Sequence, residues 1–188
     1  MIGDLTIIVV LYQEKYELIK ACLENIKNFK IIIIDNDNNT EIKKKIVSEF
    51  LIYKYILNEK NIGFSKAANI AVKLSNTKYI MNINADCLIK EEDILKLLLA
   101  NKADQNCFIT TPTFYNLENQ LSQNASIFSD KKILNNNNYF DGDTCVDWVL
   151  GAAIVFEKKI FLEIGMFDEN FFLYFLDEDI CRKAFLKK

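Results

Sequence analysis

Strand-like and helix-like patterns alternate through the first hundred residues, and this alternation constrains the fold more than any other feature of the sequence. Apolar, β-branched runs of strand length lie at residues 5–11, 31–34, 53–57 and 79–83. Segments with apolar residues at helical spacing follow them, at residues 14–28, 41–50, 64–74 and 91–100. This order predicts an α/β fold, with helices on both faces of a mostly parallel sheet.

The second half has a looser pattern. Residues 107–111 fit one more strand, and residues 113–144 are rich in Asn and Asp, which favours a loop or short strands. A further buried segment spans 146–156, and helices are predicted at 158–164 and 177–186. The chain has 188 residues, 51% of them hydrophobic, with one Pro and five Gly, so we expect a single domain without a flexible linker.

Composition excludes several classes of function. The formal charge of −3 argues against a nucleic-acid partner, and the absence of His excludes any mechanism or metal site that needs an imidazole. The five cysteines are scattered without a CxxC pair, which favours reduced packing residues. No run reaches the roughly 18–20 apolar residues of a membrane span, and no signal peptide is apparent. These features predict a cytoplasmic protein.

Polar side chains follow three of the predicted strands where each one ends. Tyr12 follows the first strand, Asp35 and Asp37 the second, and Asn84 and Asp86 the fourth. Ligands of an open parallel sheet collect at this edge, where an acid can bind a base, a ribose or a hard cation. Each acid could equally start a turn or cap the next helix. The glycine-rich loops of dinucleotide and phosphate-loop proteins are missing, so a bound phosphate would need a metal to neutralise it.

Five stretches, in chain order, carry a resemblance to a known family: "TIIVVLYQEKYELIKACLENI", "IIIIDNDN", "NEKNIGFSKAANIAV", "YIMNINADCLI" and "VDWVLGAAIVFEKKIFLEIGMFDENFFLYFLDEDICRKA". The chain resembles family 2 glycosyltransferases of the GT-A fold, close to their rhamnosyltransferase-like branch. This resemblance implies one Rossmann-like domain over residues 1–188, with a nucleotide-binding half at 1–100 and an acceptor-side half at 101–188. It also implies an inverting enzyme of surface polysaccharide synthesis, which moves a sugar from a UDP- or dTDP-sugar to a glycan or lipid-linked glycan.

The resemblance assigns the donor site to the first half. Tyr12, Asp35 and Asp37 would contact the nucleotide, and Asn61 and Gly63 would line the donor pocket. Glycine at such a position allows the backbone to approach closely.

The resemblance also assigns the metal and the base. Asn84, Ala85 and Asp86 match the family's DxD-type motif, with Asp86 as the ligand of a magnesium or manganese ion. Asp177, in "FLDEDI", aligns with the general base that removes the proton of the acceptor hydroxyl. Without the resemblance, Asp177 reads as an acid that favours the N-terminus of a helix.

Four residues are expected on the acceptor side: Trp148, Gly151, Asp168 and Glu169. Core packing is an equal alternative for Trp148 and Gly151, and a turn cap for the two acids. Five aromatic residues are expected to be mostly core: Phe167, Phe171, Phe172, Tyr174 and Phe175.

The sequence departs from the family pattern at several positions. Leu176 stands where a Glu usually precedes the base, Asn84 replaces the first acid of the motif, and the chain ends soon after its last helix. These departures keep open a domain that binds a nucleotide sugar without transferring it, and a truncated C-terminus. A sugar nucleotidyltransferase is disfavoured by the missing glycine- and arginine-rich loop. A peripheral position at the inner face of the membrane also stays open.

Overall fold

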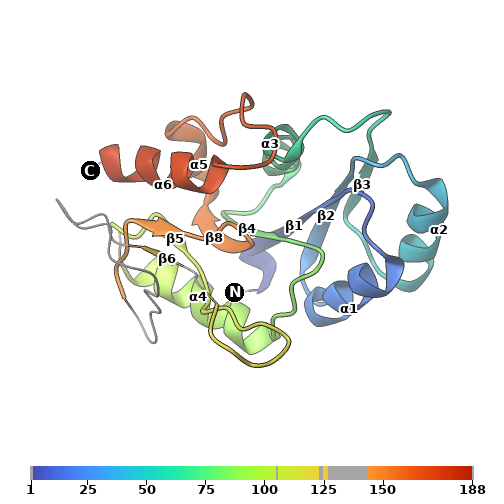
Figure 1. Cartoon of the computed structure of the whole chain (residues 1–188), viewed down its shortest axis with the longest axis horizontal. Coiled ribbons are helices and arrows are strands. Elements are labelled where there is room, and N and C mark those ends of the chain that lie inside the picture. The colour runs from blue at the N-terminus through green and yellow to red at the C-terminus, as the bar shows by residue number, and fades with distance from the viewer. Residues whose placement is uncertain (1, 105, 123–124, 127–143, 188) are drawn as a thin grey trace.

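The computed structural model describes residues 2–104, 106–122, 125–126 and 144–187, and places a six-stranded sheet between two layers of helices (Figure 1). The strand order is β3-β2-β1-β4-β8-β5. The bounds are Leu5–Leu11 for β1, Lys30–Asp35 for β2, Lys54–Leu57 for β3, Tyr79–Ile83 for β4, Ile109–Thr110 for β5 and Ala153–Glu157 for β8. Strands β1 to β4 are parallel, and β8 runs antiparallel to both β4 and β5.

Helices cover both faces of this sheet. Their bounds are Ile2–Asp4 for the short η1, Tyr16–Ile26 for α1, Thr40–Glu49 for α2, Phe64–Leu74 for α3, Glu91–Ala103 for α4, Lys158–Glu163 for α5 and Leu176–Leu186 for α6. Helices α1, α2 and α4 contribute to the core on one face, and α3, α5 and α6 to the core on the other (Figure 1).

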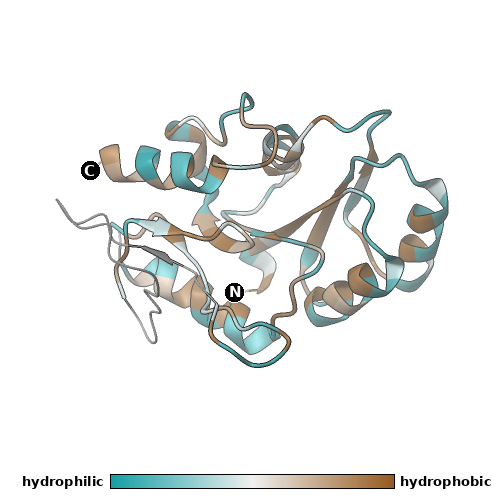
Figure 2. Cartoon of the chain, viewed as in Figure 1, coloured by the Kyte–Doolittle hydropathy of each residue, from teal (hydrophilic) through white to brown (hydrophobic). Residues whose placement is uncertain are grey.

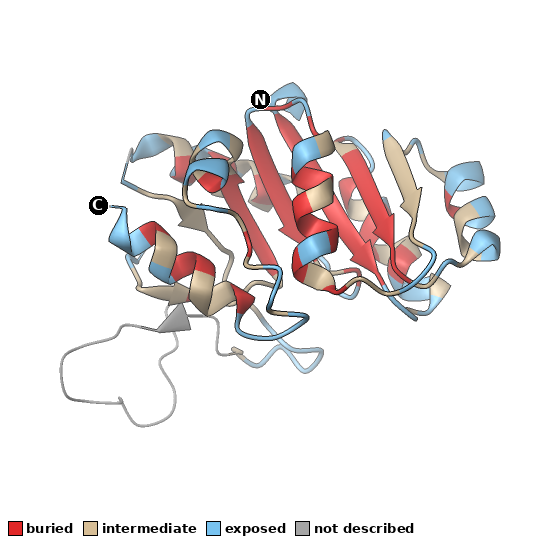
Figure 3. Ribbon diagram, turned by 90° about the horizontal axis from the view of Figure 1, so that it is seen from above, coloured by how far each residue is buried: buried red, intermediate tan, exposed pale blue. Residues whose placement is uncertain are grey.

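Strand β1 explains why the apolar runs are continuous rather than alternating. Its side chains point to opposite faces in turn, so Ile7 and Val9 pack with α1 and α4, while Ile8 and Val10 pack with α3 and α6. Helices cover both faces of the strand, and every residue of β1 is buried (Figure 3). Brown, hydrophobic colouring of the same central strands marks this core in Figure 2. A strand covered by helices on both sides must be apolar at every position.

The predicted architecture is confirmed, with one addition. The strands expected at 5–11 and 79–83 and the helix expected at 64–74 have the predicted bounds. The direction of the strand expected in residues 146–156 could not be predicted, because an apolar run looks the same in a parallel and in an antiparallel strand. It divides into β7 (Trp148–Val149), which pairs with β6 (Ala125–Ser126), and the reversed strand β8.

Part of the region predicted as loop or short strands, residues 127–143, lies outside the described residues. The division of the domain into a nucleotide-binding and an acceptor-side half stays a prediction. Among the helices that the structure describes, none is both long and apolar enough to span a bilayer.

Cys22, Cys87, Cys145 and Cys181 are free thiols, as predicted. Cys22 and Cys181 are buried in the two faces of the core, and Cys145 is exposed. Burial raises the pKa of the Cys22 and Cys181 thiols to about 12.

We therefore expect slow alkylation of Cys22 and Cys181 in the folded protein. At pH 8 a thiol with a pKa of about 12 is ionised on the order of a thousandth as often as an ordinary thiol, and only the thiolate reacts. Mass spectrometry after a pulse of iodoacetamide should find Cys145 labelled at least ~100-fold faster than either buried thiol. All five should react alike in urea; similar rates under native conditions would contradict the buried positions.

Candidate functional site

The polar residues that end the strands meet at one edge of the sheet. Strands β1 and β2 are in register up to the pair Leu11 and Asp35, and β4 lies on the other side of β1. The order of the strands reverses between β1 and β4, since β2 and β3 extend to one side and β4 to the other. Open α/β sheets bind ligands at the carboxyl ends of strands near such a reversal.

A small depression opens between the ends of β1 and β2 and the helices α1 and α2. Its lining residues are Leu11, Gln13, Glu14, Ile19, Asp35, Asp37, Asn39 and Ile42. Apolar side chains form part of the lining, and carboxylate and amide groups form the rest. The depression includes the predicted Asp35 and Asp37, whereas Tyr12 lies beside it and is 45% exposed.

Asp35 is held in one orientation by its own hydrogen bonds. Its Oδ2 accepts a hydrogen bond of 2.8 Å from the hydroxyl of Tyr55, and its Oδ1 accepts one of 2.8 Å from the amide of Asp37. Burial, followed by this bond to Asp35, raises the pKa of the Tyr55 hydroxyl, so Tyr55 stays a donor. Asp35 is only 1% exposed, so these two hydrogen bonds satisfy a carboxylate that solvent hardly reaches.

Glu14 was not recognised from the sequence, although it lines the same depression. Its carboxylate accepts a hydrogen bond from the amide of Tyr12. Burial raises the pKa of Glu14, the Tyr12 amide lowers it, and the negative charges of Asp86 and Asp35 raise it again, with a net increase. The ends of β1, β2 and β4 therefore bring several carboxylates close enough for their negative charges to repel one another. A cation or a hydrogen-bond donor on a ligand would relieve their mutual repulsion.

Asn36, between the two predicted acids, ties the strand ends together and was also missed. Its amide N–H donates to the carbonyl of Leu11 at 2.8 Å, and its side chain accepts from Nδ2 of Asn58 at 2.8 Å. Its own Nδ2 donates to the carbonyl of Gly63 at 3.3 Å. Position alone gave no signal for this role, because the neighbouring asparagines in the sequence look equivalent.

The predicted donor-pocket residues Asn61 and Gly63 shape the start of α3. Oδ1 of Asn61 accepts the amide N–H of Gly63 at 2.9 Å. Gly63 has a positive φ of 81°, and a Cβ there would lie 2.8 Å from Cδ2 and 2.9 Å from the carbonyl oxygen of Phe172. A glycine is therefore needed at position 63 because the backbone there packs directly against Phe172. Contact with a donor stays a prediction for both residues.

Asp86 is exposed just beyond β4, after the buried Ala85. Within the described residues no group of three or more acidic or thiol side chains is arranged to hold a metal ion. Magnesium is commonly bound through one or two carboxylates, with substrate phosphates and water completing its shell. Asp86 offers one exposed carboxylate of this kind at the edge of the sheet.

A short turn at residues 151–152 forms hydrogen bonds both with the end of β4 and with the start of α6. The amide of Asn84 donates to the carbonyl of Ala152 at 2.8 Å, and the amide of Gly151 donates to Oδ2 of Asp177 at 3.2 Å. A Cβ on Gly151 would lie 3.2 Å from Cβ of Asp177, so the absence of a side chain permits this contact. The structure thus brings Gly151 and Asp177 together and sets both beside the strand end that carries Asp86.

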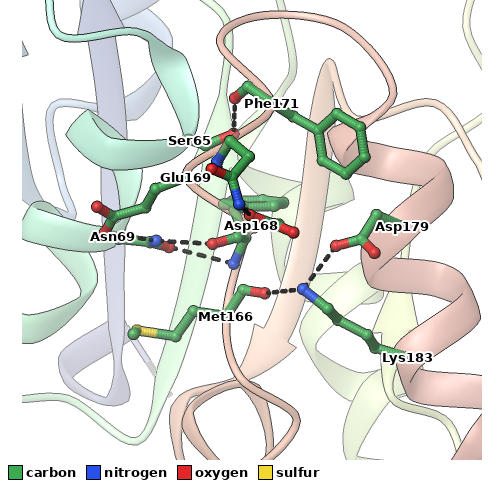
Figure 4. Close-up of polar contacts among 10 residues, drawn as sticks. Ser65, Asn69, Met166, Asp168, Glu169, Phe171, Asp179 and Lys183 are labelled. Carbon is green, nitrogen blue, oxygen red and sulfur yellow. Dashed lines mark hydrogen bonds and ion pairs between the residues drawn. The ribbon is translucent and has the colours of Figure 1, made fainter.

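The loop of residues 166–175, which leads into α6, is fastened to α3 (Figure 4). Asn69 donates from Nδ2 to the carbonyl of Phe167 at 2.9 Å and accepts the Phe167 amide at 3.2 Å. The hydroxyl of Ser65 donates to the carbonyl of Phe171 at 2.6 Å. Asn69 and Ser65 are buried, so these bonds satisfy polar groups that water cannot reach.

The same loop is fastened to α6 by Lys183 (Figure 4). Its Nζ donates to the carbonyl of Met166 at 3.1 Å and pairs with Asp179 at 2.6 Å. Two predicted acceptor-side residues, Asp168 and Glu169, make bonds within this framework: Asp168 accepts from Asn170 at 2.9 Å, and Glu169 accepts from Asn69 at 3.2 Å. Their contact with an acceptor stays a prediction.

The expectation that the aromatic residues of this loop are mostly core is wrong for three of them. Phe172, Tyr174 and Phe175 are 57%, 75% and 66% exposed, because the chain crosses the surface before α6 begins. Phe175 has a left-handed φ of 66° that redirects the backbone into the helix. Trp148, by contrast, is half-buried in β7 and packs against the core.

The sheet order and the helix layers define the molecule as a GT-A fold, and solved glycosyltransferases share it. The crystal structure of GalNAc-T7 with UDP, GalNAc and Mn²⁺ has a TM-score of 0.72 at 14% identity and covers 97% of this chain and 40% of that chain. S. aureus TarS has a TM-score of 0.69 at 17% identity over 97% of this chain and 33% of that one. At these identities the likeness concerns the fold.

A family model for Glycosyl transferase family 2 matches residues 6–161, and the chain belongs to this family. Rhamnosyltransferase WbbL of Escherichia coli K12 is 26% identical over 95% of this chain and 76% of its own length. The dTDP-rhamnosyl transferase RfbF of Shigella flexneri is 24% identical over 98% of this chain. The hexosyltransferase Agl10 of Haloferax volcanii is 25% identical over 98% of this chain. The chain spans 62% of Agl10 and 64% of RfbF.

Replacing Gly63 by alanine should destabilise the protein. The new Cβ would meet Phe172 at less than 3 Å in a backbone conformation that L residues rarely adopt, so we expect a loss of ~2–4 kcal/mol in the free energy of unfolding. Urea denaturation would measure it. Gly3→Ala is the matched control, since a Cβ at Gly3 meets no atom within 4 Å, and it should cost less than ~0.5 kcal/mol. Equal losses for the two variants would contradict the described packing of the 166–175 loop on α3.

Proposed function

We propose that this chain transfers a sugar from a nucleoside diphosphate donor to a hydroxyl group of a glycan or lipid-linked glycan, with inversion at the anomeric carbon. The observation that carries the proposal is the turn at 151–152. It hydrogen-bonds the strand end that carries Asp86 and also the carboxylate of Asp177. A donor diphosphate near Asp86 and an acceptor hydroxyl near Asp177 would then lie on either side of one short turn.

The donor nucleotide would occupy the depression at the ends of β1 and β2. Asp35 and Asp37 would accept hydrogen bonds from the base and ribose, while Leu11 and Ile42 contact the face of the ring. Tyr12, half-exposed at the rim, could cover the base. RfbF is named as a dTDP-rhamnosyl transferase, and TarS has been solved with UDP and with UDP-GlcNAc, which supports a pyrimidine nucleotide.

Asp177 would act as the general base. Its carboxylate is oriented by the amide of Gly151 and lies at the first turn of α6, where a negative charge is stabilised by the helix dipole. As the acceptor oxygen attacks the anomeric carbon, its proton would pass to Asp177, and the nucleoside diphosphate would depart with the electrons of the broken bond. The exposed rings of Tyr174 and Phe175 precede this acid and could pack against the acceptor sugar.

Asp86 would contribute one ligand to a magnesium or manganese ion, and the diphosphate and water the others. Such an ion, when bound, supplies Lewis-acid stabilisation of the charge on the departing diphosphate. The Mn²⁺ complexes of GalNAc-T7 and of the mannosyltransferase PcManGT support a divalent ion in this fold.

A domain that binds a nucleotide sugar without transferring it is the second candidate. It is favoured by Leu176, which is only 6% exposed and packs in the core with Ile180, so the carboxylate expected beside the base is missing. Replacing Leu176 by Glu would bury a charge in this core, so that variant is a poor test of the question.

Donor binding should depend on Asp86. A ligand at 100 times its Kd stabilises the folded state by ~2.7 kcal/mol, which raises the Tm of a chain of this size by ~5–10 °C. We expect one of dTDP-rhamnose, UDP-GlcNAc or GDP-mannose to give such a shift with MnCl₂, and Asp86→Ala to lose the manganese-dependent part. Glu92→Ala removes an exposed acid from α4 and should keep the full shift. A manganese-dependent shift that survives in Asp86→Ala would contradict the assignment.

Transfer should depend on Asp177. We expect Asp177→Asn to lower kcat by ~10²–10⁴-fold, because an amide cannot accept the proton, while donor binding in the thermal-shift assay stays within about twofold. Release of the nucleoside diphosphate in the presence of an acceptor measures kcat. Donor binding by the unmodified protein without any transfer would instead favour the second candidate, and full turnover in Asp177→Asn would exclude this residue as the base.

A further inference from the structure

Tyr55 reaches the end of β2 from the neighbouring strand. Its strand, β3, forms one edge of the sheet and lies beside β2 (Figure 1). Tyr55 stands opposite Ile33 in the parallel register, so Asp35 lies two residues further along β2 on the same face. The Tyr55 hydroxyl spans this step and donates to Oδ2 of Asp35 at 2.8 Å. Asp35 lines the depression, and the Tyr55 ring lies behind it, packed against the core.

The carboxylate of Asp35 begins the turn that leads from β2 to α2. Its Oδ1 accepts the amide N–H of Asp37 at 2.8 Å, a side-chain contact typical of turns that start at an aspartate. Asn38 follows with a left-handed φ of 52°, and Oδ1 of Asn39 then accepts the amide N–H of Ile42 at 3.0 Å, which caps α2. Side-chain hydrogen bonds therefore hold this turn at both of its ends.

The same turn forms one wall of the depression. Asp35, Asp37, Asn39 and Ile42 are all lining residues. Asp35 is only 1% exposed, whereas Asp37 is half-buried and more accessible. The groups that a ligand would meet on this wall therefore depend on a carboxylate that is itself almost completely buried.

Tyr55 fixes the orientation of that carboxylate. One oxygen of Asp35 is bound by the Asp37 amide and the other by the Tyr55 hydroxyl, so the group is held from two sides. The Tyr55 ring is held in turn by the core and by Lys43, whose Nζ lies 5.3 Å from the ring centroid. Burial raises the pKa of the Tyr55 hydroxyl, which therefore stays protonated and able to donate.

We propose that Tyr55 is a positioning residue of the donor site: its hydroxyl holds the Asp35 carboxylate, and through it the turn of residues 35–39, in the arrangement that receives the nucleotide. This inference rests on the proposed function. A wall that is already ordered lowers the cost of ordering on binding, which raises the affinity. Tyr55 packs on the face of α1 and α2, whereas Asp177 lies on α6 at the other face. The affinity for the donor should therefore depend on Tyr55, and the rate of transfer should not.

The first test is the affinity of Tyr55→Phe, which removes only the hydroxyl. Isothermal titration calorimetry with UDP and with dTDP, each with MnCl₂, gives the Kd. For whichever nucleotide the unmodified protein binds more tightly, we expect the Kd to rise on the order of 10-fold, because the lost bond joins a hydroxyl to a buried carboxylate. Tyr53→Phe is the matched control: its ring is 41% exposed, and its Kd should stay within about twofold. An unchanged Kd in Tyr55→Phe, or an equal rise in Tyr53→Phe, would overturn the proposal.

Turnover distinguishes positioning of the donor from a merely structural role. With dTDP-rhamnose or UDP-GlcNAc as donor, the KM of Tyr55→Phe should rise by about the same factor as the Kd, while kcat at saturating donor stays within about twofold. A merely structural role would lower the Tm and leave the KM of the folded protein unchanged, so the assays are run well below the Tm of the variant. A lower kcat with an unchanged KM would count against the proposal.

A second measurement needs no nucleotide. The Asp37 amide N–H is bonded to Asp35, and the Ile42 amide N–H is bonded to Asn39 at the other end of the turn. In Tyr55→Phe, NMR should find hydrogen exchange at the Asp37 amide accelerated by at least ~10-fold, and exchange at the Ile42 amide by less than ~3-fold. An unchanged rate at Asp37, or equal acceleration at both amides, would show that Tyr55 does not act through Asp35.

The two kinds of readout separate this inference from the proposed function. If the unmodified protein transfers sugar and Tyr55→Phe binds the donor equally well, the inference alone fails. If the unmodified protein binds no nucleoside diphosphate and no nucleotide sugar, the proposed function fails, and the positioning role fails with it, whatever the exchange rates are.

Discussion

The antiparallel pairing of β8 with β4 is the constraint on which the rest of the structure depends. It brings the second half of the chain into the sheet that the first half begins. Its last bond, from Asn84 to Ala152, lies at the edge where the polar residues end the strands. Because β8 runs opposite to β4, the turn that precedes it falls beside the end of β4. That turn then meets Asp177. A parallel β8 would place the same turn at the far edge of the sheet, away from every polar strand end.

Buried amide side chains stabilise the two irregular segments near this edge. Asn36 links the ends of β1 and β3 to the segment before α3. Asn69, within α3, holds the 166–175 loop through two hydrogen bonds to Phe167. Each satisfies backbone groups that would be costly to bury unpaired. A loop fastened at Asn69 and at Lys183 can expose aromatic rings such as that of Tyr174 and still present α6 in one orientation.

Sequence reasoning found the strand ends and failed where partners come from distant segments. Asp35 and Asp86 could be selected because each follows an apolar run, a purely local signal. Asn36 could not be selected, since its side-chain contacts join elements separated along the chain. Glu14 could not be selected either, because its proximity to Asp35 and Asp86 depends on the order of the strands.

The sequence by itself determined the layered α/β architecture and the family, because buried strands need continuous apolar runs and helices need a repeat near 3.6 residues. The motif residues of the family could be located for the same reason, as short local patterns. Tertiary structure alone decided the direction of β8, the exposure of the ring of Phe175 and the burial of Leu176. Strand direction and burial depend on what lies opposite each residue in space, and a linear pattern of apolar and polar residues does not contain that information.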